Sequence, residues 1–555
     1  MGRYTQFAAM HETEKTYLVD LLQSVPYRGD SDIKGIAISG ITADSRQVQP
    51  GNLFIAVPGQ AVDGHRYIPE AEARGCAAIL AEQGRMPPGG KRTVATIEVD
   101  DTRAALGLVA ANYYGHPARE MRMIGITGTN GKTTTAYLVE AIIRATGRPG
   151  VIGTINYRYL SRDDEKVTLE APLTTPDPIT LHRLLRRMAA AGVSHVVMEV
   201  SSHALEQKRL AGLLFDIAVF TNLSRDHLDF HGDMETYFNC KKILFCEHLK
   251  TDGKAVVILE PPADASSDRP GGPGSNWGHR LRAILDSQAA KPAGRQSLAH
   301  GHSVRVVTGC LTGPCDIYPE TFSSDLDGIT AEIVSPQGVL RLQSPLVGAF
   351  NLKNLLAAIG VGISLDLDSR QLEAVLAAVR GIPGRLERIQ SKGGGYVFVD
   401  YAHTPDALEN VLTTLRSLKP ARLICVFGCG GDRDTGKRPL MGKVAARFCD
   451  VVLVTSDNPR TEDPEKILVD IEQGLLASSL SRVAADTLIA EQDKGYDIIS
   501  SRREAIRTAV CNVRAGEVVV IAGKGHENYQ ITDTGKHFFD DRLEVKKYLK
   551  GECLC

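Results

Sequence analysis

Apolar and polar positions alternate along most of the chain in a pattern typical of α/β domains. From about residue 121, the apolar runs RMIGITG, VSHVVMEVSS, DIAVFTNL and KAVVILE are separated by stretches of helical period, of which TTTAYLVEAIIRATG is the clearest. A second series, YVFVDYAH, RLICVFGCGG, DVVLVTSDNP and EVVVIAGKGHE, begins beyond residue 380. Strands that are apolar along their whole length and alternate with helices predict parallel sheets covered on both faces.

The chain is long enough for several domains, and its pattern changes twice. The first ~120 residues carry shorter strand-like runs (IKGIAIS, NLFIAVPG, CAAILAE) between loops rich in Gly, Pro and Asp. We therefore predict an α/β protein of three domains: 1–121, 122–379 and 380–555. Residues 261–303, rich in Pro, Gly, Ser and Ala and containing the single Trp, are predicted to form an inserted surface loop. The segment GIPGRLERI (381–389) is the candidate hinge about which the last domain would move.

Composition narrows the classes of function. Apolar residues make up 43% of the 555, which is enough for hydrophobic cores. The formal charge of −2 argues against an extended basic surface for nucleic-acid binding. No apolar run approaches the ~20 residues of a membrane helix, and the N-terminus lacks a secretory apolar region. The eleven cysteines show no paired metal spacing, which fits a reducing compartment. We expect a cytoplasmic, monomeric protein with no nucleic-acid partner and no membrane insertion.

The glycine-rich segment GITGTNGKTTT (125–135) joins a strand run to a helix run. Gly128 and Gly131 would let backbone N–H groups approach a phosphate, Lys132 would add a positive charge, and Thr133 would offer a hydroxyl to Mg²⁺. Ile126 occupies the first glycine position of the strict motif, so an ordinary glycine-rich turn is the alternative. Its place between strand and helix favours nucleotide binding. The predicted ATP-binding residues are Gly128, Thr129, Asn130, Gly131, Lys132, Thr133 and Thr134.

Three further segments carry charged residues close to apolar runs. The run VVMEV ends in Glu199, and TNLSRDHLDFHG (221–232) sets Asp226, His227, Asp229 and His231 in a short loop. In METYFNCKKILF the helical period places Lys241 on one face with Tyr237, Leu244 and Phe245. From spacing alone, a lysine there is expected to reach solvent or to pair with an acid, because burying an unpaired ammonium group is costly.

Together, GTNGKTTT, MEVSSHAL, TNLSRDHLDFHG and YFNCKKILF resemble the ATP-dependent Mur ligases of peptidoglycan precursor synthesis. The resemblance implies that CO₂ carbamylates Lys241 to N6-carboxylysine, although Cys240 precedes it where a small alanine is common. A desolvated lysine has a lowered pKa, so its neutral amine can attack CO₂. The resemblance also implies Mg²⁺ held by Thr133, Glu199, His227 and the carbamate. The implied catalytic residues are Lys132, Glu199, His227 and Lys241.

The resemblance runs from about residue 35 to 545, apart from the insert, and is strongest to members that add meso-diaminopimelate to UDP-MurNAc-L-Ala-D-Glu. The resemblance implies that the first domain binds uridine, with Ser45 in TADSRQVQPGNLFIAVPG as the residue that contacts it. It makes the second domain a P-loop domain and the third a Rossmann-like domain that binds the incoming amino acid. The residues implied for the UDP-MurNAc-dipeptide are Ser45, Thr174, Thr175, Ser201, Gln207 and Arg209. Asn354 in FNLKN and His403 in YAHTP would face the nucleotide, or serve as structural hydrogen-bonding residues.

Each apolar run of the last domain ends in polar, charged or glycine residues. In open α/β sheets such carboxyl-terminal tails converge on one cleft. The resemblance assigns that cleft to diaminopimelate through Arg433, Asp457, Asn458, Pro459, Arg460, Gly523 and Glu527. Independently of it, two arginines suit the carboxylates of this amino acid, and Asp457 and Glu527 suit its ammonium groups. The alternative is a surface turn with local ion pairs.

The implied reaction couples ATP cleavage to amide formation through an acyl phosphate. Two enzyme alternatives remain open from the sequence: a lysine-adding relative and a folylpolyglutamate synthetase. A nucleotide-gated binding protein that kept the fold without the chemistry is the third. The residues Lys132, Glu199, His227 and Lys241 argue against the last.

Overall fold

The computed structural model describes residues 16–29, 33–59, 62–88, 94–261, 276–289, 304–391, 393–491 and 493–550. The chain divides into two compact units, residues 1–309 and 310–555. No helix of the described part of the chain is long and apolar enough to cross a bilayer.

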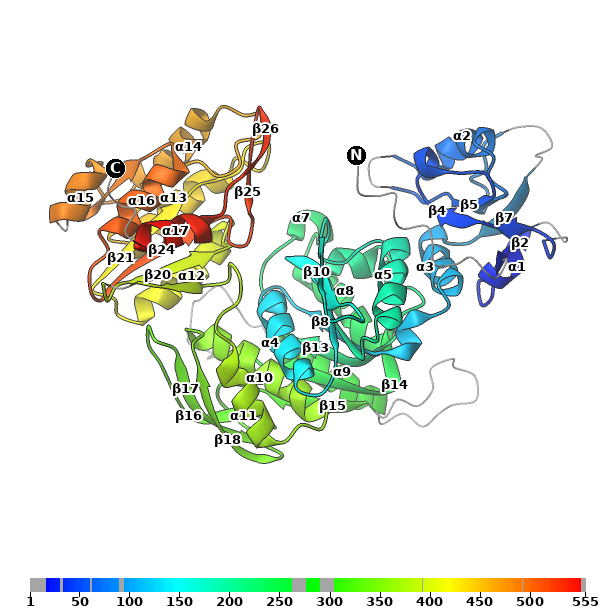
Figure 1. Ribbon diagram of the computed structural model, residues 1–555, viewed down its shortest axis with the longest axis horizontal. Helices are drawn as coiled ribbons and strands as arrows, with labels where there is room; N and C mark the ends of the chain where they lie inside the picture. The colour runs from blue at the N-terminus through cyan, green and yellow to red at the C-terminus, as the bar shows by residue number, and fades with distance from the viewer. Residues whose placement is uncertain are drawn as a thin grey trace. The chain divides into compact units, whose positions relative to one another are not determined.

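The N-terminal part of the first unit is a five-stranded sheet in the order β2-β7-β6-β5-β4, parallel except at β2 (Figure 1). Its alternate residues enter two cores: Leu53 and Ile55 pack with helix α3, whereas Phe54 and Ala56 pack with helix α2. The elements are β1 Thr16–Tyr17, α1 Leu18–Leu21, β2 Arg28–Gly29, β3 Ala37–Ile38, β4 Gly40–Thr42, β5 Asn52–Ile55, α2 Ile68–Ala73, β6 Ala78–Glu82, β7 Ala95–Val99 and α3 Thr102–Tyr113, with 3₁₀ turns Ser45–Gln47, Gly64–Tyr67 and Pro117–Glu120. The three strand-like runs predicted from the sequence are confirmed as β3, β5 and β6.

The rest of the first unit is built on an eight-stranded sheet, β11-β10-β9-β12-β8-β13-β14-β15, whose strands β9, β12, β8, β13, β14 and β15 are parallel. Strand β8 is buried at every position after its first, which requires cover on both faces. The elements are β8 Arg122–Thr127, α4 Lys132–Arg144, β9 Pro149–Ile152, β10 Asn156–Leu160, β11 Lys166–Glu170, α5 Pro178–Ala190, β12 His195–Glu199, α6 Ser202–Glu206, β13 Phe215–Phe220, α7 Leu228–His231, α8 Met234–Cys246, β14 Leu249–Ile258, α9 Trp277–Ala289 and β15 Arg305–Gly309.

The predicted insert is only partly a loop, and the prediction is wrong for α9. Trp277, Leu281 and Leu285 are spaced four residues apart and are all buried, so this stretch has the apolar stripe of a helix. Arg280 on α9 forms a two-pronged ion pair with Glu235 of α8, at 2.7 and 2.8 Å. The remainder of 261–303 lies almost wholly outside the described residues.

The second unit begins with an antiparallel sheet that the sequence analysis missed, β16-β17-β18, whose strands lie side by side in Figure 1. Strand β17 alternates strictly between buried and less buried positions, the ordinary signature of a half-buried strand. Cys310 and Cys315 form a disulfide before it, a pairing that their spacing did not predict. The elements are β16 Tyr318–Ser324, β17 Ile329–Ser335, β18 Gly338–Ser344, α10 Ala349–Ser364 and α11 Ser369–Ala378.

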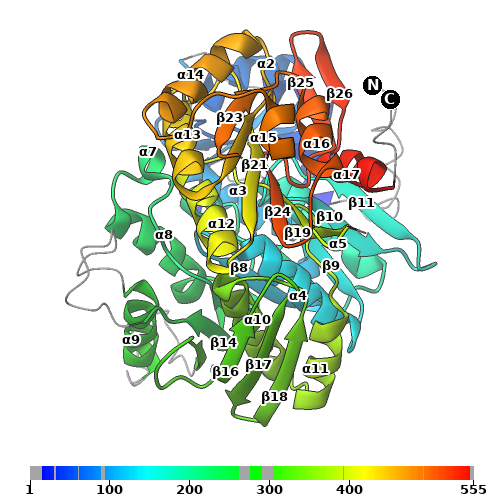
Figure 2. The same ribbon diagram turned by 90° about the vertical axis from the view of Figure 1, so that its left-hand side faces the viewer.

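The last part of the chain is a six-stranded sheet, β19-β20-β24-β21-β22-β23, parallel except at β19. Helices α12, α13 and α14 cover one face and α15, α16 and α17 the other, as Figure 2 shows on either side of β21 and β24. The elements are β19 Glu387–Gln390, β20 Tyr396–Asp400, α12 Pro405–Ser417, β21 Arg422–Phe427, α13 Lys437–Phe448, β22 Val451–Val454, α14 Pro464–Leu476, α15 Ala485–Glu491, β23 Gly495–Ile498, α16 Arg502–Cys511, β24 Glu517–Ala522, β25 Tyr529–Thr532, β26 Gly535–Phe538 and α17 Asp541–Leu549. The Rossmann-like fold is confirmed, whereas the domain boundaries 1–121, 122–379 and 380–555 and the hinge stay predictions.

Candidate active site

The glycine-rich loop turns from β8 into α4, as the sequence predicts. Gly128 has φ +149°, and a Cβ there would lie 2.0 Å from Thr221 Oγ1; Gly131 has φ +85° and caps α4. Ile126 is a buried strand residue, which is why a glycine is not needed at that position. Lys132 starts α4, and its ammonium group donates to the carbonyls of Gly128 and Thr129, both at 2.8 Å. The loop therefore has the shape and charge of a phosphate cradle.

The segment after β13 supports this loop from behind. Thr129 Oγ1 lies 3.2 Å from the carbonyl oxygen of Ser224 and 3.3 Å from the hydroxyl of Tyr237, and the Asn130 N–H donates to Asn222 Oδ1. Part of TNLSRDHLDFHG thus holds the cradle in place. Thr134 is buried at the start of α4.

Glu199, at the end of β12, is the centre of a hydrogen-bond network beside the loop. Its carboxylate accepts from Thr133 Oγ1 and Thr154 Oγ1, each at 2.9 Å, and from the Thr154 N–H at 3.0 Å. The side chain is buried, and a Cβ on Gly153 would approach its Oε1 to 2.3 Å. The Thr133 hydroxyl donates its hydrogen to Glu199, and a hydroxyl oxygen in this state can serve as a ligand to a cation. This donor set fits a hard cation such as Mg²⁺.

Lys241, on α8, is buried, which corrects the expectation from spacing that it would reach solvent. Its Nζ donates to the Gly128 carbonyl at 3.0 Å, the same oxygen that Lys132 contacts. Burial, and secondarily the charge of Lys132, hold the pKa of Lys241 well below its usual value. A neutral amine in this position is a competent nucleophile toward CO₂. Burial also raises the pKa of the adjacent Cys240 thiol to about 12, so this thiol stays protonated.

His227 lies at the N-terminus of α7 with φ +52°, and its side chain is about half exposed. Its ring stands edge-on to those of His203 and Tyr237, with centroids 5.1 and 6.2 Å away. Within the described ranges, no three His, Cys, Asp or Glu side chains gather into a ready-made cation site. A hydrogen bond joins Thr133 to Glu199, two of the residues implied for Mg²⁺. The role of His227 as a metal ligand stays a prediction.

Five of the six residues predicted for the dipeptide form one network that leads from Glu199. Thr174 Oγ1 lies 3.1 Å from Thr154 Oγ1, and Thr175 Oγ1 donates to the Glu199 carbonyl at 2.8 Å while accepting from the Ser201 N–H. The hydroxyl of Ser201 caps α6 by accepting from the Ala204 N–H.

Arg209 extends this network outward. It donates to the Thr175 carbonyl at 2.8 Å and to Gln207 Oε1. Burial lowers the pKa of Arg209. The five predicted dipeptide residues of this domain are therefore brought together. Thr175 uses its hydroxyl within the protein, and the dipeptide-binding role of all five residues stays a prediction. Ser45 lies far from them in sequence, in the N-terminal domain, where its buried hydroxyl donates to Glu70 Oε2 at 2.9 Å.

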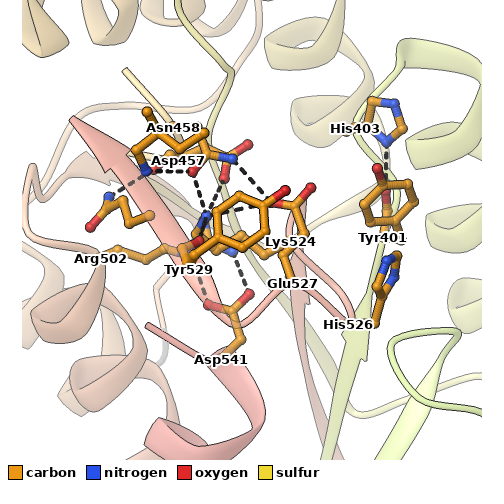
Figure 3. A network of polar contacts seen from close by, with 12 residues as sticks. Tyr401, His403, Asp457, Asn458, Arg502, Lys524, His526, Glu527, Tyr529 and Asp541 are labelled. Carbon is orange, nitrogen blue, oxygen red and sulfur yellow. Dashed lines mark hydrogen bonds and ion pairs between the residues drawn. The ribbon is translucent and has the colours of Figure 1, made fainter. Parts of the chain in front are cut away.

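A second polar cluster lies at the carboxyl ends of the strands of the last domain (Figure 3). The tail of β22 contributes Asp457 and Asn458, and the tail of β24 contributes Lys524 and Glu527. Asn458 Nδ2 donates to Glu527 Oε2 at 3.0 Å. Burial, and secondarily the charge of Asp457, raise the pKa of Glu527, whereas Lys524 opposes the shift. The convergence of these tails, predicted from their sequences, is confirmed.

The other tails join the same end of the sheet. Arg460, with φ +57°, donates to the Gly431 carbonyl in the tail of β21 at 2.7 Å, and Pro459 is buried beside it. Gly523 has φ +119°, which only glycine adopts without strain. Arg433 is exposed.

The two residues predicted to face the nucleotide both make structural hydrogen bonds. His403 Nδ1 donates to the Tyr401 carbonyl at 2.8 Å. Asn354 is buried in α10 and donates to Asn351 Oδ1 at 3.1 Å. Their roles toward the nucleotide stay predictions.

Sequence reasoning missed Gly153, Thr154 and Lys524. The first two follow β9 in the run VIGTIN, where Gly-Thr at a strand end is a common turn and gives no signal of its own. Lys524 stands inside GKGHE, yet nothing in one sequence distinguishes a buried lysine from an exposed one in a glycine-rich tail.

Family models match three stretches of the chain: "Mur ligase family, catalytic domain" residues 37–114, "Mur ligase middle domain" residues 126–270 and "Mur ligase, glutamate ligase domain" residues 384–525. These matches agree with the three-domain organisation predicted from the sequence.

Curated relatives match nearly the whole chain. A UDP-N-acetylmuramoyl-L-alanyl-D-glutamate–2,6-diaminopimelate ligase from Geobacter metallireducens is 45% identical over 92% of this chain and 94% of its own. One of the same name from Gloeobacter violaceus is 42% identical over 93% and 95%. A solved structure of that name superposes with a TM-score of 0.65 at 33% identity, covering 98% of this chain and all of the other. The chain belongs to the Mur ligase family.

Proposed function

We propose that this chain is an ATP-dependent amide ligase that adds meso-diaminopimelate to the D-glutamate of UDP-MurNAc-L-Ala-D-Glu, a step of peptidoglycan precursor synthesis. The observation that carries the proposal is the convergence of SDNPR and GKGHE on one cluster of opposite charges, in a chain whose relatives bear the name of this activity. A substrate with ammonium and carboxylate groups at both ends requires such a mixture.

The reaction proceeds in two steps. The γ-carboxylate of the D-glutamyl residue attacks the γ-phosphorus of ATP, and the bond to ADP breaks to leave an acyl phosphate. The unprotonated amine of diaminopimelate then attacks the acyl carbon, and the tetrahedral intermediate expels phosphate. The amide takes the nitrogen, and the proton leaves with solvent or phosphate. The protein's task is to bring anions together and to orient them.

Each group near the glycine-rich loop has a part in that task. Lys132 and the amides of the loop neutralise the phosphates. Thr133, Glu199, His227 and a carbamylated Lys241 would hold Mg²⁺, which supplies charge neutralisation between the phosphate and the attacking carboxylate. Arg209, with Thr174 and Ser201 near it, suits the acidic dipeptide.

The last domain delivers the amine. Arg460 and Arg433 suit the carboxylates of diaminopimelate, and Asp457 and Glu527 suit its ammonium groups. L-Lysine lacks the distal carboxylate and would leave a binding arginine unpaired, which disfavours it. Movement about residues 381–389 is proposed to bring this amine to the acyl phosphate.

An acceptor comparison tests the proposal. ADP release is measured with ATP, Mg²⁺ and UDP-MurNAc-L-Ala-D-Glu in the presence of meso-diaminopimelate, L-lysine or D-Ala-D-Ala. We expect turnover with diaminopimelate to exceed the others by at least a hundredfold. Equal rates would refute the assignment of the acceptor, and no ADP release with any acceptor would indicate a binding protein without chemistry.

A further inference from the structure

The ammonium group of Lys524 is completely buried between the tails of β22 and β24. It donates to Asn458 Oδ1 at 2.8 Å and to the Tyr529 carbonyl at 2.7 Å, and lies 3.2 Å from Asp457 Oδ1 and 3.7 Å from Glu527 Oε2. Figure 3 shows it at the centre of this group. A lysine inside a domain is costly unless its charge and its donors are matched, and here both are.

This contact and the Ile531 N–H together fix which way the Asn458 amide points. Asn458 Oδ1 accepts from Lys524 Nζ and from the Ile531 N–H at 3.0 Å, so the oxygen must face Lys524. The amide nitrogen is thereby directed to Glu527 Oε2, to which it donates. Without the lysine, the amide would keep one acceptor contact in place of two, and its orientation would be less restricted.

Lys524 also sets the charge balance of the cluster. Asp457 and Glu527 together bring two carboxylates, and one ammonium group leaves a single negative charge. Arg502, another buried cation of this domain, is already paired with Asp541 at 2.7 and 2.8 Å. The charged and titratable groups that interact with Glu527 are Asp457, Lys524, Arg460, Arg502 and Tyr401.

We propose that Lys524 is a positioning residue for the amino-acid acceptor: it aligns the Asn458 amide and holds the carboxylates of Asp457 and Glu527 side by side for an acceptor ammonium group. This rests on the proposed function, because it assigns the cluster to the same acceptor. A lysine with a merely structural role would stabilise the domain without altering acceptor recognition.

Lys524→Met distinguishes a positioning role from a merely structural one, because methionine keeps most of the side-chain volume and removes the charge. The matched control is Arg422→Met. Arg422 is a buried cation of the same sheet, but it starts β21, at the strand end opposite the tails, and donates to the carbonyls of Leu488 and Asp493. We expect Lys524→Met to raise the KM for diaminopimelate at least tenfold, with the KM for ATP within threefold of wild type. Arg422→Met is expected to lower the unfolding midpoint and leave both KM values within threefold.

The pH profile supplies a second readout. Removing an ammonium group within 4 Å raises the pKa of Glu527, so the acid limb of kcat/KM for the acceptor should move to higher pH by about one unit. If Lys524→Met does not fold, Asn458→Asp tests the proposal in its place. This variant keeps the oxygen that Lys524 contacts but loses the nitrogen that donates to Glu527. An unchanged acceptor KM in folded Asn458→Asp would overturn the proposal.

The two proposals can fail separately. Wild-type protein is assayed first, and no turnover with diaminopimelate would refute the proposed function. Wild-type turnover combined with an unchanged acceptor KM and pH profile in Lys524→Met would refute only the role of Lys524.

Discussion

Replacing Glu199 with glutamine tests how the phosphate loop prepares its cation ligand. In the native protein the Thr133 and Thr154 hydroxyls both donate to Glu199 Oε2, and the Thr154 N–H donates to Oε1. The backbone N–H can only donate, so the amide oxygen of the introduced glutamine must take the Oε1 position. The amide nitrogen then donates to the hydroxyls, and the Thr133 hydrogen turns outward, toward the place of the cation.

The magnitude follows from these contacts. The substitution removes one negative charge and turns a Thr133 lone pair away from the proposed Mg²⁺ site. Removal of one preorganised electrostatic contact costs about 3–4 kcal/mol of transition-state stabilisation, so kcat should fall by roughly 10²–10³. Stability should fall less, by about 1–3 kcal/mol, because the exchanged hydrogen bonds are re-formed without the charge.

The assay is ADP release over a titration of Mg²⁺, with unfolding monitored on the same samples. The Mg²⁺ concentration that gives half-maximal rate should rise at least tenfold in Glu199→Gln. Thr154→Val is the matched control, since it removes one hydroxyl from Oε2 but leaves the charge and the Thr133 hydrogen in place; we expect less than a tenfold loss of kcat. A Glu199→Gln enzyme with wild-type Mg²⁺ dependence would refute the reasoning.

The remaining predictions concern the other groups of the two sites. Lys241→Ala should abolish turnover, and short-chain carboxylates added to the assay should restore part of it by replacing the carbamate; full activity in the variant would remove the carbamate from the mechanism. Arg460→Lys should raise the KM for diaminopimelate at least tenfold and the KM for ATP less than twofold, because lysine lacks the planar fork; equal losses would indicate misfolding. Gly153→Ala should raise the Mg²⁺ concentration needed for half-maximal rate, as Glu199→Gln does, because the added methyl group would lie 2.3 Å from Glu199 Oε1. An unchanged Mg²⁺ dependence would show that the backbone moves away without displacing Glu199.

The parts of the fold that follow from periodicity were predictable. The apolar runs of the last domain became β20, β21, β22 and β24, and their tails meet because parallel strands end on one edge. Strands β16 to β18 were missed although β17 alternates strictly, and helix α9 was missed because its apolar stripe lies inside a Pro- and Gly-rich stretch. For α9, local composition obscured a periodic signal, whereas the alternation of β17 was present and was overlooked.

The candidate site was predictable only where a residue type dictates chemistry. The glycines of the phosphate loop have the positive φ angles that their positions indicated, and Lys132 lies beside them at the start of α4. The burial of Lys241 went against the expectation from helical spacing, and the resemblance alone pointed to it. The bond between Thr133 and Glu199 joins residues 66 positions apart, so it depends on the adjacency of β8 and β12, which spacing along one sequence does not encode.

Lys132 and Lys241 both donate to the carbonyl oxygen of Gly128, and this shared contact would link folding to the proposed reaction of Lys241 with CO₂. Burial, and secondarily the charge of Lys132 at the same carbonyl oxygen, lower the pKa of Lys241, so folding favours the loss of its proton. Under the proposed carbamylation, the repulsion between the two lysines would become attraction, because an anion would then face Lys132. The folded chain should therefore be measurably harder to melt in bicarbonate-rich buffer than in degassed buffer, and Lys241→Ala should lose that difference.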